Sequence, residues 1–469
     1  MEKYYLAVDI GASSGRHILG HLENGKIELE EIYRFENGMD HKDGKLLWNV
    51  DRLFGEILNG MKKCKEQGKI PVSMDIDTWA VDYVLLDEQD RILGDTYGYR
   101  DHRTDGMDAE VAKILPETEL YAKTGIQKQI FNTIYQLMAV KQKEPELLQR
   151  AKTLLMLPDY FGFRLTGNKL SEYTNGSTTQ LVNPTTFQWD TDLIRKLGYP
   201  EDIFLPLKMP GTKVGQLLPE IQKEVGFNLE VALCGSHDTA SAVMAVPQTE
   251  GDGIYISSGT WSLMGIESLK PIINEEAAAA NFTNEGGYDH RFRFLKNIMG
   301  LWMIQSVRHE YNDTYSFAQL CEMAEDSRDF PSRVDVNDPG FLSPDSMVEA
   351  IKQYCQKTGQ PVPESVGELA SVVYRSLAQS YGETVSGLEK IAGRTYDSIH
   401  IIGGGSNAAY LNQLTADATG KTVYAGPGEA TAIGNLLAQM IHAEELADLK
   451  SARKCVRESF EIKTFVPGK

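Results

Sequence analysis

A carboxylate and an imidazole stand side by side among small residues in the segment Ser236-His237-Asp238-Thr239-Ala240-Ser241-Ala242. A helix that starts near Thr239 would place Asp238 at its N-terminus, where the helix dipole favours an ionised carboxylate. Such a group can accept the proton of a hydroxyl that attacks a phosphorus atom, and phosphoryl transfer needs little other covalent chemistry from a protein. The simpler alternative is an aspartate that only caps the helix. We predict that Asp238 is a catalytic base.

Two other segments share a pattern, an apolar run followed by a turn rich in glycine and serine. The first runs from Tyr5 to Arg16 and the second from Ile254 to Leu263. Turns of this kind expose backbone N–H groups and hydroxyls that can hold phosphate oxygens. Either segment alone could be an ordinary hairpin. Their matching positions in two halves of the chain predict a duplicated domain that holds a nucleotide from both sides.

Only the first of these turns is preceded by an aspartate, Asp9. Because Mg²⁺ takes a few oxygen ligands together with waters and phosphate, one well-placed carboxylate suffices, and we assign Asp9 to a magnesium site. Ser13, Ser14 and Arg16 then offer hydroxyl and guanidinium donors to phosphate. Arg16 could instead form a plain surface ion pair. The second copy is expected to bind phosphate only.

A third turn, Gly403-Gly404-Gly405, follows a strand-like run at 399–402 and precedes a helical pattern over 408–419. Three glycines let the backbone approach a flat or bulky ligand such as adenine or ribose. The nearby Gly420-Lys421-Thr422 is not the end of a phosphate-binding P-loop, because the glycine required five residues earlier is Thr415 and a strand follows.

Composition excludes several classes of function. A chain of 469 residues is too long for one core, so two or more domains are expected. The net charge of −19 argues against a nucleic acid or an anionic membrane as a partner, and no apolar run approaches the length of a membrane span. The five scattered cysteines fit reduced thiols, with no zinc motif. We expect a cytoplasmic monomer or small homo-oligomer whose partners are small molecules.

Hydrophobic periodicity predicts the elements that position these residues. Runs at 17–22 and 26–32, joined by Asn24-Gly25, predict a β-hairpin. Apolar residues at helical spacing predict a crossover helix over 51–68, and the run at 74–86 returns as one or two strands. Antiparallel strands, a helix and a further strand indicate a mixed α/β layer fold.

The second half of the chain repeats this start. Polar insertions from about 99 to 188 are expected to build a substrate pocket, and the polar segment 248–253 predicts a boundary between domains 1–246 and 247–469. Strand, turn and strand then recur, and a long helix is expected around 369–391. No long linker separates the halves.

Together these segments resemble the FGGY family of sugar kinases. The segments that carry the resemblance are 8–16, 75–82, 157–160, 236–242, 258–262 and 403–406. Three more are similar to a narrower group of the family that acts on L-rhamnulose, namely 172–175, 179–183 and 295–302. The resemblance extends from Tyr5 to about Pro467.

The resemblance implies two actin-like (ribonuclease-H-like) α/β domains with mixed sheets, which bind ATP and a sugar in the cleft between them. It implies transfer of the γ-phosphoryl group of ATP to the 1-hydroxyl of L-rhamnulose, with Asp238 as proton acceptor. The ATP-binding residues that it implies are Ala12, Ser13, Ser14, Gly15, Arg16, Thr260, Gln305, Gly403, Gly404 and Gly405. The substrate-binding residues that it implies are Ala80, His237, Thr239 and Asn297.

Asp77 and Trp79 are further substrate-binding candidates, because Trp79 lies between Asp77 and Asp82 in a very polar setting for a strand. A tryptophan is more often part of a core. At Ala80 the narrower group carries glycine in its substrate loop, so a methyl group could crowd the sugar here. The chain also ends soon after Pro467, sooner than the resemblance implies.

Three alternatives stay open at this point. One is a kinase for L-fuculose or another deoxyketose, which would differ only in the insertion loops. The second is an actin-like ATPase that acts as a chaperone or polymer subunit, and the third is a sugar sensor without catalysis. The presence of Asp238 argues against the last two.

Overall fold

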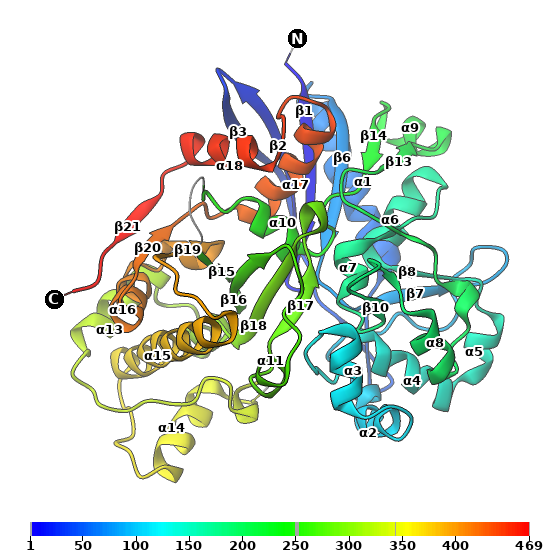
Figure 1. The fold of residues 1–469 in the computed structure, drawn as a ribbon. Coiled ribbons are helices and arrows are strands. Elements are labelled where there is room, and N and C mark those ends of the chain that lie inside the picture. The colour runs from blue at the N-terminus through cyan, green and yellow to red at the C-terminus, as the bar shows by residue number, and fades with distance from the viewer. Residues whose placement is uncertain (1, 249–252, 343, 469) are drawn as a thin grey trace. The chain divides into compact units, whose positions relative to one another are not determined.

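The chain folds into two compact units, each built from several segments (Figure 1). The computed structural model describes residues 2–248, 253–342 and 344–468. Unit 1 contains Met1–Ala245, Glu267–Phe294 and Thr431–Ser459, and unit 2 contains Val246–Ile266, Leu295–Ala430 and Phe460–Lys469. The first change of unit falls one residue before the predicted boundary, whose polar residues 249–252 lie outside the described ranges.

A six-stranded mixed sheet forms the centre of unit 1, in the order β13-β14-β6-β1-β2-β3. In chain order these strands are β1 (Tyr4–Ile10), β2 (Ser14–Glu23), β3 (Lys26–Glu36), β6 (Pro71–Thr78), β13 (Lys213–Gln216) and β14 (Glu230–Ala232). β2 is antiparallel to β1 and β3, and β6 is parallel to β1. Asn24 and Gly25 join β2 to β3 with φ angles of 51° and 78°, as a tight hairpin turn requires. The predicted hairpin is confirmed.

Two helices cover opposite faces of this sheet. Val8 lies in one apolar cluster with residues of α1 (Val50–Glu66), whereas Ala7 lies in another with residues of α17 (Ala430–His442). Successive side chains of a strand point to opposite faces, so the clusters lie on different sides of β1. Because α1 covers all but the last two residues of 51–68, the predicted crossover helix is confirmed.

The insertions of unit 1 form a second apolar core beside the sheet. The run predicted as one or two strands at 74–86 is two, β6 and β7, separated by a loop. The remaining elements of this unit are β4 (Asp40–Lys42), β5 (Lys45–Leu47), β7 (Tyr83–Leu86), η1 (His102–Thr104), α2 (Met107–Ala112), α3 (Glu117–Thr124), α4 (Thr133–Lys143), α5 (Pro145–Arg150), β8 (Thr153–Met156), α6 (Leu157–Thr166), β9 (Ser171–Glu172), α7 (Tyr173–Ser177), β10 (Val182–Asn183), β11 (Gln188–Trp189), α8 (Thr191–Leu197), η2 (Glu201–Ile203), β12 (Leu207–Lys208), α9 (Pro219–Val225), α10 (Asp238–Met244), α11 (Glu275–Ala279), β17 (Thr283–Gly286), η3 (Tyr288–His290) and α18 (Leu449–Ser459).

A second mixed sheet has the order β17-β18-β16-β15-β19-β20-β21. Its further strands are β15 (Ile254–Ser258), β16 (Trp261–Ser268), β18 (Phe292–Met299), β19 (Ser398–Ile402), β20 (Thr422–Ala425) and β21 (Lys463–Phe465). β15 is antiparallel to β16 and parallel to β19, which is the pattern of β1 with β2 and β6. The repeat confirms the predicted duplication and the mixed α/β fold class.

Helices of unit 2 flank the strands of this sheet. They are α12 (Trp302–Glu310), α13 (Phe317–Asp326), η4 (Pro339–Phe341), α14 (Met347–Lys357), α15 (Val366–Ala392), η5 (Gly404–Asn407) and α16 (Ala409–Thr419). α15 begins at a capping box formed by Ser365 and Glu368 and ends at Gly393, so the long helix predicted around 369–391 is confirmed. Among the described residues, no helix combines the length and the apolar character needed to cross a bilayer.

Candidate active site

Three charged residues lie in one row across neighbouring strands of unit 1. Asp9 on β1 is in register with Asp77 on β6 and with Arg16 on β2. The Arg16 guanidinium donates to Asp9 Oδ2 from Nε at 3.0 Å and from Nη2 at 2.9 Å. The alternative of an ion pair is therefore realised, but its partner is the carboxylate predicted for the metal. Asp9 and Asp77 lie next to the last residues of β1 and β6, and the predicted phosphate-binding turn follows β1.

The turn after β1 is tied down by its own backbone and by a neighbouring side chain. The Gly11 N–H donates to the Ser14 carbonyl at 2.8 Å, and Asn37 Nδ2 donates to the Gly11 carbonyl at 2.8 Å. Ala12 and Ser13 form the tip, and Ser13 is exposed. These hydrogen bonds fix the base of the turn, while its tip presents backbone groups and the Ser13 hydroxyl to solvent.

Asp238 is the first residue of α10, and His237 is the N-cap. The preceding loop joins the end of β6, because the Thr78 N–H donates to the Ser236 carbonyl at 2.9 Å and Thr78 bridges to His237. The predicted helix start is confirmed. Asp238 is partly exposed, with 32% of its side chain accessible, and Thr239 Oγ1 donates to its Oδ1 at 3.1 Å.

Burial, and then the charge of the neighbouring Asp9 carboxylate, raise the pKa of Asp238 to about 7. Hydrogen bonding from Thr239 and the charge of Arg293 act in the opposite direction on the same pKa. Burial, followed by Asp9, also raises the pKa of Asp77, whose Oδ2 accepts a hydrogen bond from Asn435 Nδ2 at 2.7 Å. Near neutral pH, Asp238 is therefore a carboxylate with unusual affinity for a proton.

The imidazole beside Asp238 is neutral and has a defined tautomer. Arg293 Nη2 lies 2.9 Å from His237 Nδ1 and can only donate, so Nδ1 is the acceptor and Nε2 carries the proton. His237 Nε2 lies 3.4 Å from Asp238 Oδ1. Burial, and then the charge of Arg293, hold the pKa of His237 well below its usual value. The sequence prediction missed Arg293, because no spacing signal links residues 56 positions apart.

Polar side chains of the insertions hold the loop that carries His237. Glu172 Oε2 accepts from the Ser236 hydroxyl at 2.6 Å and from the Ser236 N–H at 3.2 Å. The His237 N–H donates to Thr174 Oγ1 at 3.3 Å, and the Thr174 hydroxyl in turn donates to Glu172. The segment 172–175, which resembles one subgroup of the family, thus helps to position Asp238. We call Asp9, Asp77 and Asp238 the acidic centre, because their charges act on one another's pKa values.

The predicted substrate loop is organised around Asp82. Its Oδ2 accepts hydrogen bonds from the indole nitrogens of Trp48 and Trp79 at 2.6 and 2.9 Å and from the Tyr99 N–H at 3.0 Å. Its Oδ1 accepts from Gln136 Nε2 at 3.0 Å. Burial raises the pKa of Asp82 to about 6 despite these donors. Both oxygens of Asp82 are therefore occupied inside the protein.

The other candidates of this loop lie in different environments. Trp79 is buried and packs on Trp48 with ring centroids 4.0 Å apart, whereas Ala80 is half-buried. Asp77 Oδ1 is buried without a hydrogen-bond partner and lies in the row with Asp9. Asp75 Oδ2 is also buried without a hydrogen-bond partner, but of these two aspartates it is Asp77 that is in register with Asp9.

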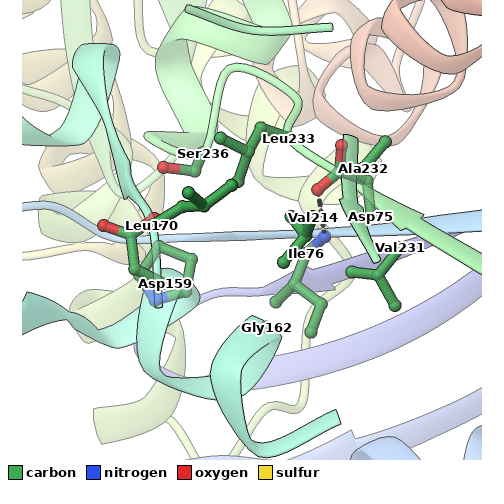
Figure 2. Close-up of a pocket in the computed structure, with 11 residues that line it drawn as sticks. Asp75, Ile76, Asp159, Gly162, Leu170, Val214, Val231, Ala232, Leu233 and Ser236 are labelled. Atoms are coloured by element: carbon green, nitrogen blue, oxygen red, sulfur yellow. Dashed lines mark hydrogen bonds between the residues drawn. The ribbon is translucent and has the colours of Figure 1, made fainter. Parts of the chain in front are cut away.

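A small cavity borders Ser236 on the side of the sheet core (Figure 2). Asp75 and Asp159 line it together with apolar residues of β14 and α6, and it has room for about one water molecule. A ketose does not fit there. Burial raises the pKa of both carboxylates, which holds them toward their neutral forms. This cavity is therefore not the binding site of the ketose.

The glycine-rich turns of unit 2 pack against each other. A Cβ atom on Gly405 would lie 1.9 Å from Ser258 Oγ, so only glycine fits beside the turn after β15. Gly403 has a φ angle of 81°, in the left-handed region that favours glycine. The Trp302 N–H at the start of α12 donates to the Thr260 carbonyl at 3.1 Å. Gln305 lies one turn further along α12.

The predicted site residues divide between the two units. The group in unit 1 comprises Asp9, Ala12, Ser13, Ser14, Gly15, Arg16, Asp77, Trp79, Ala80, His237, Asp238 and Thr239. The group in unit 2 comprises Thr260, Asn297, Gln305, Gly403, Gly404 and Gly405. Asn297 is half-buried on β18.

Two sheets with one repeated pairing pattern, a carboxylate suited to act as a base, and Gly/Ser turns define an actin-like phosphotransferase. Solved structures show the same fold. A xylulose kinase from Lactobacillus acidophilus superposes with a TM-score of 0.81 over 99% of this chain and 94% of that chain, at 16% identity. A glycerol kinase from Plasmodium falciparum, solved with ADP, has a TM-score of 0.77, with 99% and 94% covered, at 14% identity.

Sequence comparison is more specific. Profiles of the FGGY family of carbohydrate kinases match residues 4–245 with the N-terminal domain and residues 254–443 with the C-terminal domain. Curated proteins named rhamnulokinase are 55% identical in Halalkalibacterium halodurans and 51% identical in Oceanobacillus iheyensis, each over 99% of this chain and 98% of the relative. A third, from Bacillus subtilis, is 46% identical over 99% of this chain and 95% of its own length. The chain belongs to the FGGY family of carbohydrate kinases.

Proposed function

We propose that this chain transfers the γ-phosphoryl group of ATP to the 1-hydroxyl of L-rhamnulose, giving L-rhamnulose 1-phosphate and ADP. The observation that carries the choice of sugar is the 55% identity to a protein named rhamnulokinase over nearly the whole length of both chains. The acidic centre supplies the chemistry, because Asp238 combines partial exposure with a raised pKa.

In the proposed reaction, Asp238 accepts the proton of the 1-hydroxyl while that oxygen attacks the γ-phosphorus. A new O–P bond forms as the bond between the γ-phosphorus and the bridging oxygen breaks, and ADP leaves. His237, Thr239, Ala80 and Asn297 are the proposed sugar contacts. The proposed nucleotide contacts are Ala12, Ser13, Ser14, Gly15, Arg16, Thr260, Gln305, Gly403, Gly404 and Gly405. Orientation and charge stabilisation would then supply most of the rate.

We also propose that the reaction uses Mg²⁺ near Asp9. Hard carboxylate oxygens suit Mg²⁺, which keeps several waters and needs only one or two protein ligands. The residues present fit such an ion, because Asp77 Oδ1 is buried without a partner and the carboxylates of Asp9 and Asp238 raise its proton affinity. When bound, the ion would neutralise phosphate charge, and Asp9 with Asp77 would hold it.

An assay of ADP release over a panel of ketoses tests this proposal. The expected result is turnover that depends on sugar, with L-rhamnulose giving the highest kcat/KM. Higher kcat/KM with L-fuculose or another deoxyketose would identify that sugar as the substrate instead. ADP release that is independent of every ketose would support the actin-like ATPase, and binding of a sugar without turnover would support the sensor.

We place the reaction in the cytoplasm. All five cysteines are free, which fits a reducing compartment. Fractionation of the source cells, with the activity followed in the cytosol and the membrane pellet, tests this location.

A further inference from the structure

A fully buried guanidinium lies next to the acidic centre. Arg293 on β18 has no accessible side-chain surface, and its Nε donates to the Gly286 carbonyl at 2.8 Å. Its Nη2 forms an ion pair with Glu285 Oε2 at 3.1 Å and contacts His237 Nδ1 at 2.9 Å. Its Nη1 is buried without a hydrogen-bond partner. A buried ion pair contributes little net stability. The role of Arg293 is therefore sought in its contact with His237.

The contact fixes the chemical form of His237. Arginine is always protonated and has no acceptor atom, and its Nη2 lies closer to His237 Nδ1, at 2.9 Å, than Glu285 Oε2 does, at 3.4 Å, so Nδ1 is the unprotonated acceptor. The proton of the neutral ring is then on Nε2, the nitrogen that lies 3.4 Å from Asp238 Oδ1. A lysine would supply charge at this position but not the planar fork that orients the ring.

The hairpin that carries Arg293 is held firmly within unit 1. The Gly286 N–H donates to Ser177 Oγ at 2.7 Å, and the Tyr121 hydroxyl donates to the Phe282 carbonyl at 2.9 Å. A Cβ atom on Gly286 would lie 2.4 Å from the ring of Tyr173, so the strand approaches α7 too closely for any other residue. The guanidinium therefore has little freedom to leave His237.

We propose that Arg293, with Glu285 as its counter-charge, is a positioning residue that holds His237 as the neutral Nε2–H tautomer facing the proton acceptor Asp238. The proposal rests on the proposed function only in taking Asp238 as that acceptor. Neither Arg293 nor Glu285 touches the reacting atoms in this assignment.

The first test compares kcat and KM for the sugar in Arg293→Met, Arg293→Lys and the native enzyme. Because His237 would no longer be held in one orientation beside Asp238, we expect kcat of Arg293→Met to fall by about tenfold or more, while the KM for ATP stays within a few-fold. Arg293→Lys should retain only part of the native kcat, because lysine lacks the planar fork. A folded Arg293→Met with native kcat would overturn the proposal. Arg164→Met, which removes a half-buried arginine paired with Asp51 elsewhere in unit 1, is the matched control and should change neither kcat nor KM.

The second test needs no activity and is therefore independent of the proposed function. Nitrogen-15 NMR of labelled histidine in the native protein should show His237 as the Nε2–H tautomer, and the population should become mixed in Arg293→Lys. A native ring protonated on Nδ1 would overturn the proposal even if Arg293→Met fails to fold. Absence of turnover with every ketose, together with the expected tautomer, would instead contradict the proposed function alone.

Discussion

Asp82 follows β6 in the chain, and the loop before Asp238 is hydrogen-bonded to the end of the same strand. Burial raises the pKa of Asp82 to about 6, and burial together with Asp9 raises the pKa of Asp238 to about 7. Their surroundings differ. Asp82 is 2% exposed and accepts four hydrogen bonds from protein groups. Asp238 has one side-chain hydrogen bond, from Thr239, and 32% of its side chain is accessible. A raised pKa alone therefore does not identify a reactive carboxylate. The number of hydrogen bonds that each carboxylate already accepts distinguishes Asp82, which is fully occupied, from Asp238, which we propose as the reactive one.

The largest effect is expected for Asp238→Asn, which tests whether Asp238, in contrast to Asp82, takes part in the reaction. Because the amide cannot accept the sugar proton, we expect kcat to fall by at least about a thousandfold, within the range of general acid–base contributions. ATP binding, measured by calorimetry, should stay within about threefold of native, since the phosphate turns are unchanged. Near-native turnover by this variant would show that Asp238 is only the helix cap of α10.

Asp82→Asn should act on binding and stability instead of chemistry. The amide presents N–H groups to donors that now meet a carboxylate, so the free energy of unfolding should fall by about 2–3 kcal/mol. The looser loop should raise the KM for the sugar by about tenfold, while kcat stays within a few-fold. Denaturant unfolding and steady-state kinetics measure both effects. Asp95→Asn, at an exposed pair with Lys45, is the control and should change neither. A selective loss of kcat in Asp82→Asn would place Asp82 among the reacting groups.

Because the pKa of Asp238 is raised in the folded protein, the stability of the fold should depend on pH. Its pKa is raised in the folded state, so the folded protein binds more protons than the unfolded chain between about pH 4 and pH 7, and stability falls as the pH rises through this window. Asp238→Asn does not lose stability in this way, because asparagine does not titrate. Its melting temperature should exceed that of the native protein by about 2–4 °C at pH 8, allowing for partial exposure, and should approach it at pH 5. A lower melting temperature at pH 8 would mean that the native carboxylate is stabilised, not strained.

The smallest expected effect concerns backbone strain beside Asp82. Val81 has a φ angle of 68°, rare for a β-branched residue, and its carbonyl accepts from Thr133 Oγ1 at 2.7 Å. In Val81→Gly the relief of strain should offset the lost packing, so the free energy of unfolding should change by less than about 1 kcal/mol. Val84→Gly, in the adjoining strand β7, should cost about 3 kcal/mol or more. Equal losses in the two variants would show that Val81 is not strained.

Local signals predicted much of the fold. Asn24-Gly25 fixes its hairpin by turn geometry, and helical spacing fixes α1, because both depend on residues close in sequence. The repeated strand and turn patterns likewise predicted the duplicated sheets. The start of α10 at Asp238 followed from the preference of aspartate for a helix N-terminus.

The surroundings of the candidate site could not be predicted in this way. Asp77 meets Asn435 across 358 positions, and His237 meets Arg293 across 56, with no spacing rule that relates them. The polar setting of Trp79 was visible in the sequence. Its cause was not, because the indole donates to Asp82, which Trp48 and Gln136 reach from other elements. Tertiary packing decides which carboxylate has its hydrogen bonds satisfied within the protein and which stays available.

The role of Asp238 as proton acceptor can be tested by the pH dependence of kcat/KM for L-rhamnulose in the native enzyme at saturating ATP. If Asp238 is the proton acceptor and its pKa is about 7, kcat/KM should be level above that pH and fall about tenfold per unit below it. A profile that stays level down to pH 5 would contradict the account.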